Sequence, residues 1–80
     1  MTDSEVQAHI EQLVTEEHRL LEQAEAHSLS DAERKRLEDV NVQLDRYYDL
    51  LRQRRAREEF GQDPDSAKMR APETVERYLQ

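Results

Sequence analysis

The stretch from Leu37 to Arg57 constrains the fold most, because its apolar residues recur at alternating spacings of three and four. This repeat is typical of a coiled-coil helix, whose apolar seam has to be covered by another helix. The stretch ends in a run of arginines. The sequence therefore predicts a helix that needs a partner. It leaves open whether the arginines bind something or form an ordinary solvated helix end.

Composition favours a single small domain made of helices. The 80 residues include one glycine, two prolines and no cysteine, and 39% of them are charged. The regular spacing of the apolar residues distinguishes the chain from a disordered one. A chain this short buries a small core, and without cysteine it has no disulfide to support it. Oligomerisation is the remaining means of stabilisation.

The chain is expected to be cytoplasmic, with no membrane partner. Its start, MTDSEVQAHI, lacks the basic region and apolar run of a secretion signal. No apolar run approaches the roughly 20 residues that a membrane-spanning helix needs. The formal charge of -7 would be repelled by an anionic membrane or a nucleic acid backbone. Any basic function therefore has to be local.

Two capping signals predict a helical hairpin over residues 1–61. Thr2 with Glu5, and Ser30 with Glu33, have capping-box spacing. They predict a first helix over about 3–26, a turn at 27–30 and a second helix over about 31–60. Gly61 is expected to end the second helix in the left-handed conformation. A turn this short makes the two helices antiparallel neighbours.

Residues 62–80 are expected to form an irregular tail with a short helix over about 72–79, since both prolines lie there. That helix would carry Val75, Tyr78 and Leu79. Folding the hairpin at its turn places Val6 near Leu51 and Ile10 near Tyr47 or Tyr48. The predicted hairpin or dimer core consists of Val6, Ile10, Leu13, Leu20, Leu37, Val40, Leu44, Tyr47, Tyr48 and Leu51.

Two helices cover this apolar surface only by half. Burying the remainder would add on the order of 10 kcal/mol, at roughly 1.5 to 3 kcal/mol for each full side chain. We therefore predict an all-α fold that dimerises into a four-helix bundle, that is, a homo-oligomer. The alternative is a monomer whose tail covers the open face.

The candidate interaction surface lies at the end of the second helix and consists of Arg52, Arg54, Arg55, Arg57 and Phe60. Arginines there could grip phosphates or pair with carboxylates of a partner protein. They could equally pair within the hairpin, beside Asp3 and Glu5 at the acidic start of the first helix. The main hypothesis is an interaction module with an unknown protein partner. Nucleic acid binding, which the net charge disfavours, stays the alternative.

No residue pattern predicts catalysis, so the chain is not expected to be an enzyme, and neither a metal nor another cofactor is expected. The three histidines are nine residues apart and cannot converge from one helix. His18 and Glu22 form at most a fragment of a metal site. The carboxylates are interpreted as a solvated face with nearby arginines, as in Glu33 with Arg36, or Asp45 and Asp49 with Arg46 and Arg52.

Three segments resemble a small, mainly actinobacterial family known as domain of unknown function 2630. They are EEHRL (16–20), LDRYYDLLRQRRAREEFGQDPD (44–65) and VERYLQ (75–80). In that family a Cys-Trp pair often stands where this chain has Tyr47 and Tyr48, and an arginine where it has Glu58. These departures weaken a metal, redox or purely basic role here. The resemblance implies a helical hairpin in a cytoplasmic bacterial protein, and it implies no activity.

Overall fold

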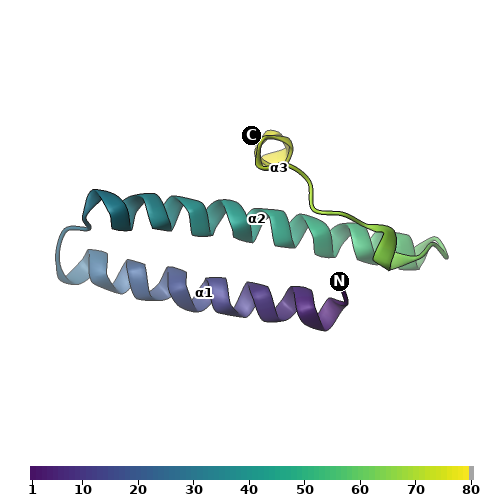
Figure 1. Ribbon diagram of the computed structural model, residues 1–80, viewed down its shortest axis with the longest axis horizontal. Coiled ribbons are helices and arrows are strands. Elements are labelled where there is room, and N and C mark those ends of the chain that lie inside the picture. The colour runs from purple at the N-terminus through teal and green to yellow at the C-terminus, as the bar shows by residue number, and fades with distance from the viewer. Residues whose placement is uncertain (80) are drawn as a thin grey trace.

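The fold is an antiparallel pair of long helices with a short appendage. The computed structural model describes the backbone of residues 1–79 and the side chains of residues 1–75. Helices α1 (Asp3–Ala26) and α2 (Asp31–Glu59) lie side by side, and the 3-10 helix η1 (Pro64–Ser66) and helix α3 (Pro72–Leu79) follow (Figure 1). The described residues contain no strand. The predicted all-α hairpin with a short C-terminal helix is confirmed.

Each long helix begins at a complete capping box. Glu5 N–H donates to Thr2 Oγ1 at 3.2 Å, and Thr2 N–H donates to the Glu5 carboxylate at 3.2 Å. Ser30 and Glu33 repeat this exchange at 3.1 and 2.9 Å. These bonds satisfy backbone donors that the first turn of a helix leaves unpaired. The donated backbone N–H groups also lower the pKa of Glu5 and of Glu33 below the ordinary value, because they stabilise the charged carboxylate.

The end of α2 depends on Gly61, which has a φ of 71°. This left-handed conformation costs a residue with a Cβ about 1 kcal/mol or more, whereas glycine adopts it freely. The chain can therefore leave the helix here and turn back along α2. Phe60, just before the glycine, is 77% exposed.

The best-packed part of the molecule lies at the open end of the hairpin, which we call the tail-covered half. Val6 of α1 and Leu50 and Leu51 of α2 form a buried cluster there. Ile10 and Tyr47 pack against it, and so do Ala67 and Met69 of the tail, residues 62–79. Side chains from three layers meet, namely α1, α2 and the tail. The predicted proximity of Val6 to Leu51 is confirmed by this cluster.

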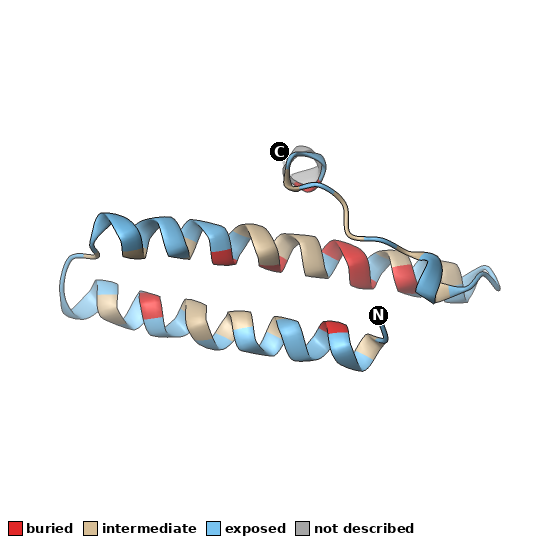
Figure 2. Ribbon diagram, in the orientation of Figure 1, coloured by how far each residue is buried: buried red, intermediate tan, exposed pale blue. Residues whose placement is uncertain are grey.

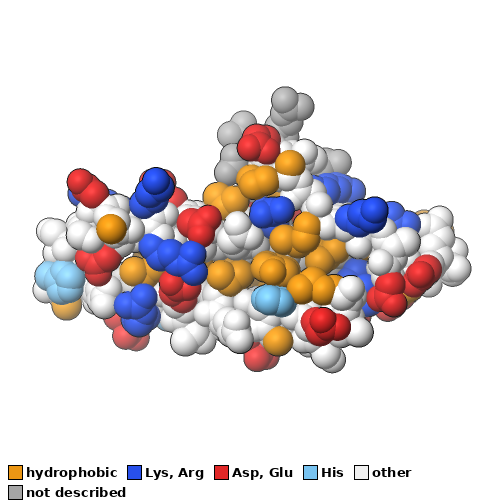
Figure 3. Space-filling view, in the orientation of Figure 1, with side chains coloured by type: hydrophobic (Ala, Val, Ile, Leu, Met, Phe, Trp, Pro, Cys, Tyr) orange, Lys and Arg blue, Asp and Glu red, His pale blue; other side chains and the backbone are white. Residues whose placement is uncertain are grey.

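The remainder of the hairpin, residues 13–40, is called the turn half, and among the described residues it has only the two layers α1 and α2. Leu20 and Val40 are buried, but Leu13, Val14 and Leu37 are only half-buried, and Leu21 is 46% exposed. Figure 2 shows the buried positions of α2 concentrated toward the tail. In Figure 3 apolar side chains gather over the middle of the molecule, and the turn end is mostly charged or polar.

One predicted core residue is not in the core of this chain. Tyr48 is 41% exposed, because α1 packs on the neighbouring face of α2 and the tail on another, so neither covers it. Leu50, which is not among the predicted core residues, is 3% exposed because the tail lies over it. The ring of Tyr47 stays half-buried.

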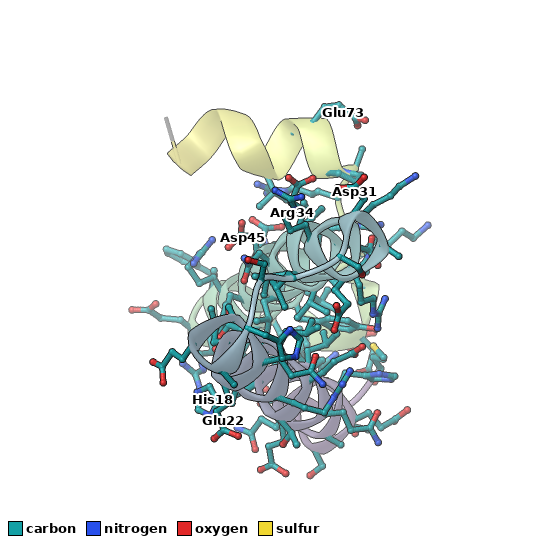
Figure 4. The ribbon with its side chains drawn as sticks, turned by 90° about the vertical axis from the view of Figure 1, so that its left-hand side faces the viewer. His18, Glu22, Asp31, Arg34, Asp45 and Glu73 are labelled. Atoms are coloured by element: carbon teal, nitrogen blue, oxygen red, sulfur yellow. The ribbon has the colours of Figure 1, made fainter. Side chains whose placement is uncertain are left out.

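The tail runs back along α2 and is joined to it by polar side chains. Gln53 Nε2 donates to the carbonyl of Lys68 at 2.9 Å, and Arg46 Nε donates to the carbonyl of Arg70 at 3.0 Å. Helix α3 then crosses α2, since Figure 1 shows it end-on and Figure 4 lengthwise. Val75 is 1% exposed. The side chains of Tyr78 and Leu79, predicted to be apolar contacts, lie outside the described residues.

Candidate functional site

The structure divides the predicted arginine surface into buried and exposed members. Arg52 and Arg55 are exposed and Arg57 is half-buried, whereas Arg54 is only 4% exposed. The inclusion of Arg54 in the candidate interaction surface is therefore wrong. Arg54 follows Tyr47 and Leu51 at seam spacing, so it occupies the next inward position of the helix. Extending the seam by one position would have revealed this.

Arg54 joins three parts of the chain. Its Nε donates to Asp3 Oδ1 of α1 at 2.6 Å, and its NH1 group donates to Asp65 Oδ1 at 2.9 Å and to the Pro64 carbonyl at 3.2 Å. The hydrogen bond with Asp3, and then that with Asp65, raises the pKa of Arg54. The expected pairing of an arginine with the acidic start of α1 is confirmed for Asp3. Arg54 therefore acts as a structural joint.

Asp49 is a second buried charge that the sequence did not reveal. It was interpreted as part of a solvated face, but it is 4% exposed because the tail covers it. Its carboxylate accepts hydrogen bonds from Gln53 Nε2 at 2.9 Å and from Arg70 NH1 at 3.4 Å. Among the described side chains no buried nitrogen or oxygen lacks a hydrogen-bond partner. Burial of these charges is tolerated because each is paired.

One edge of the hairpin carries polar contacts between α1 and α2. Arg36 donates to both carboxylate oxygens of Glu16, at 2.6 and 2.7 Å, and the rings of His9 and Tyr47 stack with centroids 4.9 Å apart. The Arg36 hydrogen bond lowers the pKa of Glu16. Arg36 therefore does not pair with Glu33 as the sequence suggested, since Glu33 is engaged by Ser30 in the cap.

The opposite edge of α2 is open and contains a shallow groove. The groove has a volume of about 400 Å³ and is lined by Asp45, Tyr48, Leu51, Arg52 and Arg55. Figure 4 looks along the two long helices and labels Asp45, which lies on this edge. A tyrosine ring and a leucine between charged groups of both signs are suited to contact with a protein surface. This open edge is the candidate functional site.

The residues considered as a fragment of a metal site lie on α1 and not in the groove on α2. The described residues include no group of three or more histidine, cysteine, aspartate or glutamate side chains that could hold a metal. His18 and Glu22 lie on the outer side of α1, where both are exposed (Figure 4). None of the described helices has the length and apolar character to span a membrane.

Comparison with known proteins points to one family. The chain is 44% identical over 78 residues to uncharacterized proteins of Mycobacterium tuberculosis and Mycobacterium bovis, and these alignments cover 96% of this chain and 90% of each relative. No solved structure matches the chain. A model of the family described as protein of unknown function DUF2630 matches residues 2–80. The resemblance noted in the sequence is thus confirmed, and the chain belongs to the DUF2630 family.

Proposed function

We propose that this protein acts by self-association, as a non-catalytic, cytoplasmic homo-oligomerisation module. The observation that carries the proposal is the uneven coverage of the apolar surface. The tail contacts α2 at Arg46, Leu50 and Arg54, and among the described residues the turn half has no third layer. A second copy is the partner always present at the same concentration as the chain itself, and small helical hairpins commonly gain a core by pairing.

The available apolar surface is large enough to matter. Leu21 and Tyr48 are 46% and 41% exposed, and Leu13, Val14 and Leu37 are half-buried. Completing the burial of a leucine-sized side chain contributes up to about 1.5 to 3 kcal/mol, so several half-covered side chains offer about 3 to 6 kcal/mol. That amount is a large share of the stability of a small domain, about 5 to 15 kcal/mol.

The nucleic acid alternative has weaker support. Arg54 is engaged by Asp3 and Asp65, so the run offers fewer cations to phosphates than the sequence suggested. The formal charge of -7 opposes approach to a polyanion. If gel shifts at low salt nevertheless showed binding that was lost on Arg52→Ala with Arg55→Ala, the alternative would be favoured.

Self-association is tested by sedimentation velocity over a wide concentration series. We expect the mass to rise from one chain to two, and the melting temperature to increase with protein concentration, because association stabilises the folded chain by mass action. A mass of one chain at every concentration, with a melting temperature independent of concentration, would refute the proposal.

A further inference from the structure

The open edge of α2 carries a regular pattern of charge. Its residues follow one another at spacings of three and four, so they form one continuous stripe along the helix. All of them are exposed except Asp45, which is half-buried. We call these residues the open stripe: Glu38, Asn41, Asp45, Tyr48, Arg52 and Arg55.

The charge pattern of the open stripe is complementary to the same pattern read in the opposite direction along the helix. Its acidic residues, Glu38 and Asp45, lie toward the turn, and its basic residues, Arg52 and Arg55, lie toward the tail. The stripe is also symmetric in spacing about the midpoint between Arg46 and Tyr47. If it is turned end for end about that point, Glu38 falls opposite Arg55, Asn41 opposite Arg52, and Asp45 opposite Tyr48.

We propose that a second copy of this chain docks on the open stripe, with the two α2 helices antiparallel and the two-fold axis passing between Asp45 and Tyr48. This inference rests on the self-association proposed above and names its surface. In it Glu38 pairs with Arg55 of the second copy. Arg52 donates to the side-chain oxygen of Asn41 of the second copy, and Tyr48 donates its hydroxyl hydrogen to Asp45 of the second copy. Two-fold symmetry repeats each contact.

The shape of the edge agrees with this arrangement. The groove of about 400 Å³ beside Asp45 and Tyr48 leaves room for the tyrosine ring of the second copy. The half-buried Ile10 and Val14 of α1 lie level with the proposed axis, because Ile10 and Tyr47 pack against the same cluster. On α1, Glu16 faces the edge of the hairpin where it pairs with Arg36. Val14 is two residues away and therefore lies on nearly the opposite side of the helix, toward the open edge. The contact therefore gains apolar area between its polar pairs.

The charged residues at the ends of the open stripe are available to pair with a second copy. Within the described chain Glu38 and Arg55 have no ion-pair partner, and the contact of Arg52 with Asp49 is long, at 4.0 Å.

Neighbouring registers of the two antiparallel α2 helices are less complementary in charge. A shift of one heptad toward the turn brings Arg52 opposite Arg34 of the second copy, which is repulsive. The opposite shift moves Glu38 past the end of the facing helix.

Charge reversal at the predicted pair tests the proposal. We expect Glu38→Arg alone and Arg55→Glu alone to raise the dimer dissociation constant by roughly tenfold, because two attractive pairs become two repulsive ones. An equimolar mixture of the two variants should dimerise again, since the arginine introduced in one chain then faces the glutamate introduced in the other. Sedimentation velocity measures all three samples, and circular dichroism checks that each variant keeps its helices.

Matched controls carry the same charge changes away from the open stripe. Lys68→Glu in the tail and Glu22→Arg on α1 alter exposed positions and should leave the dissociation constant within about twofold of the wild type. If the wild-type chain dimerises but the two reversals do not differ from these controls, or if the mixture is not restored, this interface is wrong and self-association stands. If the wild-type chain stays monomeric at every concentration, both proposals fail.

Discussion

The two halves of the hairpin have the same kind of apolar seam but differ in how completely it is buried. In the tail-covered half the cluster of Val6, Leu50 and Leu51 lies beneath the tail, and even Asp49 and Arg54 are buried. In the turn half Leu13 and Leu37 remain half-buried. The difference shows that two helices alone bury Leu20 and Val40, and that a third layer extends burial to further positions of α2.

Polar side chains of α2 bind the third layer, in addition to the apolar contacts of Ala67 and Met69. Arg46, Gln53 and Arg54 donate to tail carbonyls, and Arg54 also pairs with Asp65. Each donor is fixed on the rigid α2, so the irregular tail obtains partners for backbone groups that have none in a helix. Predictions that separate the halves follow, from the largest expected effect to the smallest.

Replacing Leu44 by aspartate should abolish folding. Leu44 is 6% exposed and lies where the two halves meet, so the new carboxylate would be buried without a partner. We expect a loss of more than about 4 kcal/mol, comparable to the whole stability of a small domain. Helical circular dichroism at dilute concentration measures it, and an unchanged melting curve would show that the seam is not the core.

A pair of identical substitutions compares the halves directly. Leu50→Ala in the tail-covered half should cost about 2 to 5 kcal/mol, since Leu50 is 3% exposed and a cavity would remain. Leu37→Ala in the turn half should cost about 1 kcal/mol, because its side chain is already partly in water. Urea denaturation at a protein concentration below the dimer dissociation constant measures the two losses in unfolding free energy. Equal losses would contradict the proposed difference between the halves.

Removal of Arg54 should release the tail without unfolding the hairpin. Arg54→Ala leaves the carboxylates of Asp3 and Asp65 without their shared cation and the Pro64 carbonyl without its donor. We expect faster amide hydrogen exchange at Ser66 and Ala67, whose N–H groups are bonded in η1, than in the wild type. Arg55→Ala is the control, because Arg55 is exposed. Similar amide hydrogen exchange rates in the two variants would contradict the role of Arg54 in holding the tail.

Acid should weaken each half at its capping box. The pKa of Glu33 in the folded chain lies below the ordinary value of 4.5, so its charge stabilises the fold above that pH. The contribution is lost as the pH falls through the lower folded value. We expect Glu33→Gln to have a slightly lower melting temperature than the wild type at neutral pH, and the same one once the pH has fallen below the folded pKa of Glu33. Melting curves that stay parallel over this range would exclude the charge of Glu33 as the cause.

Local patterns predicted the elements of this fold but not all of its burial. Thr2 with Glu5 and Ser30 with Glu33 form the capping boxes that start both helices, and Gly61 takes the left-handed conformation after α2. These features depend on residues three or four positions apart. Tyr48, by contrast, has seam spacing but faces solvent, because its burial depends on which faces the other layers cover.

The candidate site was predicted only in part for the same reason. The sequence drew attention to the arginine run, and Arg52 and Arg55 do line the open groove. It did not show that Arg54 turns inward or that Asp49 is covered. Arg54 could have been found by extending the seam one position, whereas nothing local distinguishes the buried Asp49 from the half-buried Asp45 one turn before it.

The sequence by itself determined the two long helices, their ends and their antiparallel pairing, because caps, heptad spacing and a short turn act over a few residues. Only the tertiary structure decided which charges are buried and which edge stays open. The path of the tail decides both, and that path is set by hydrogen bonds between residues far apart in the chain, such as Arg46 with Arg70 and Gln53 with Lys68. The seam identified the helix, and the tail determined which side of it remains free to meet another chain.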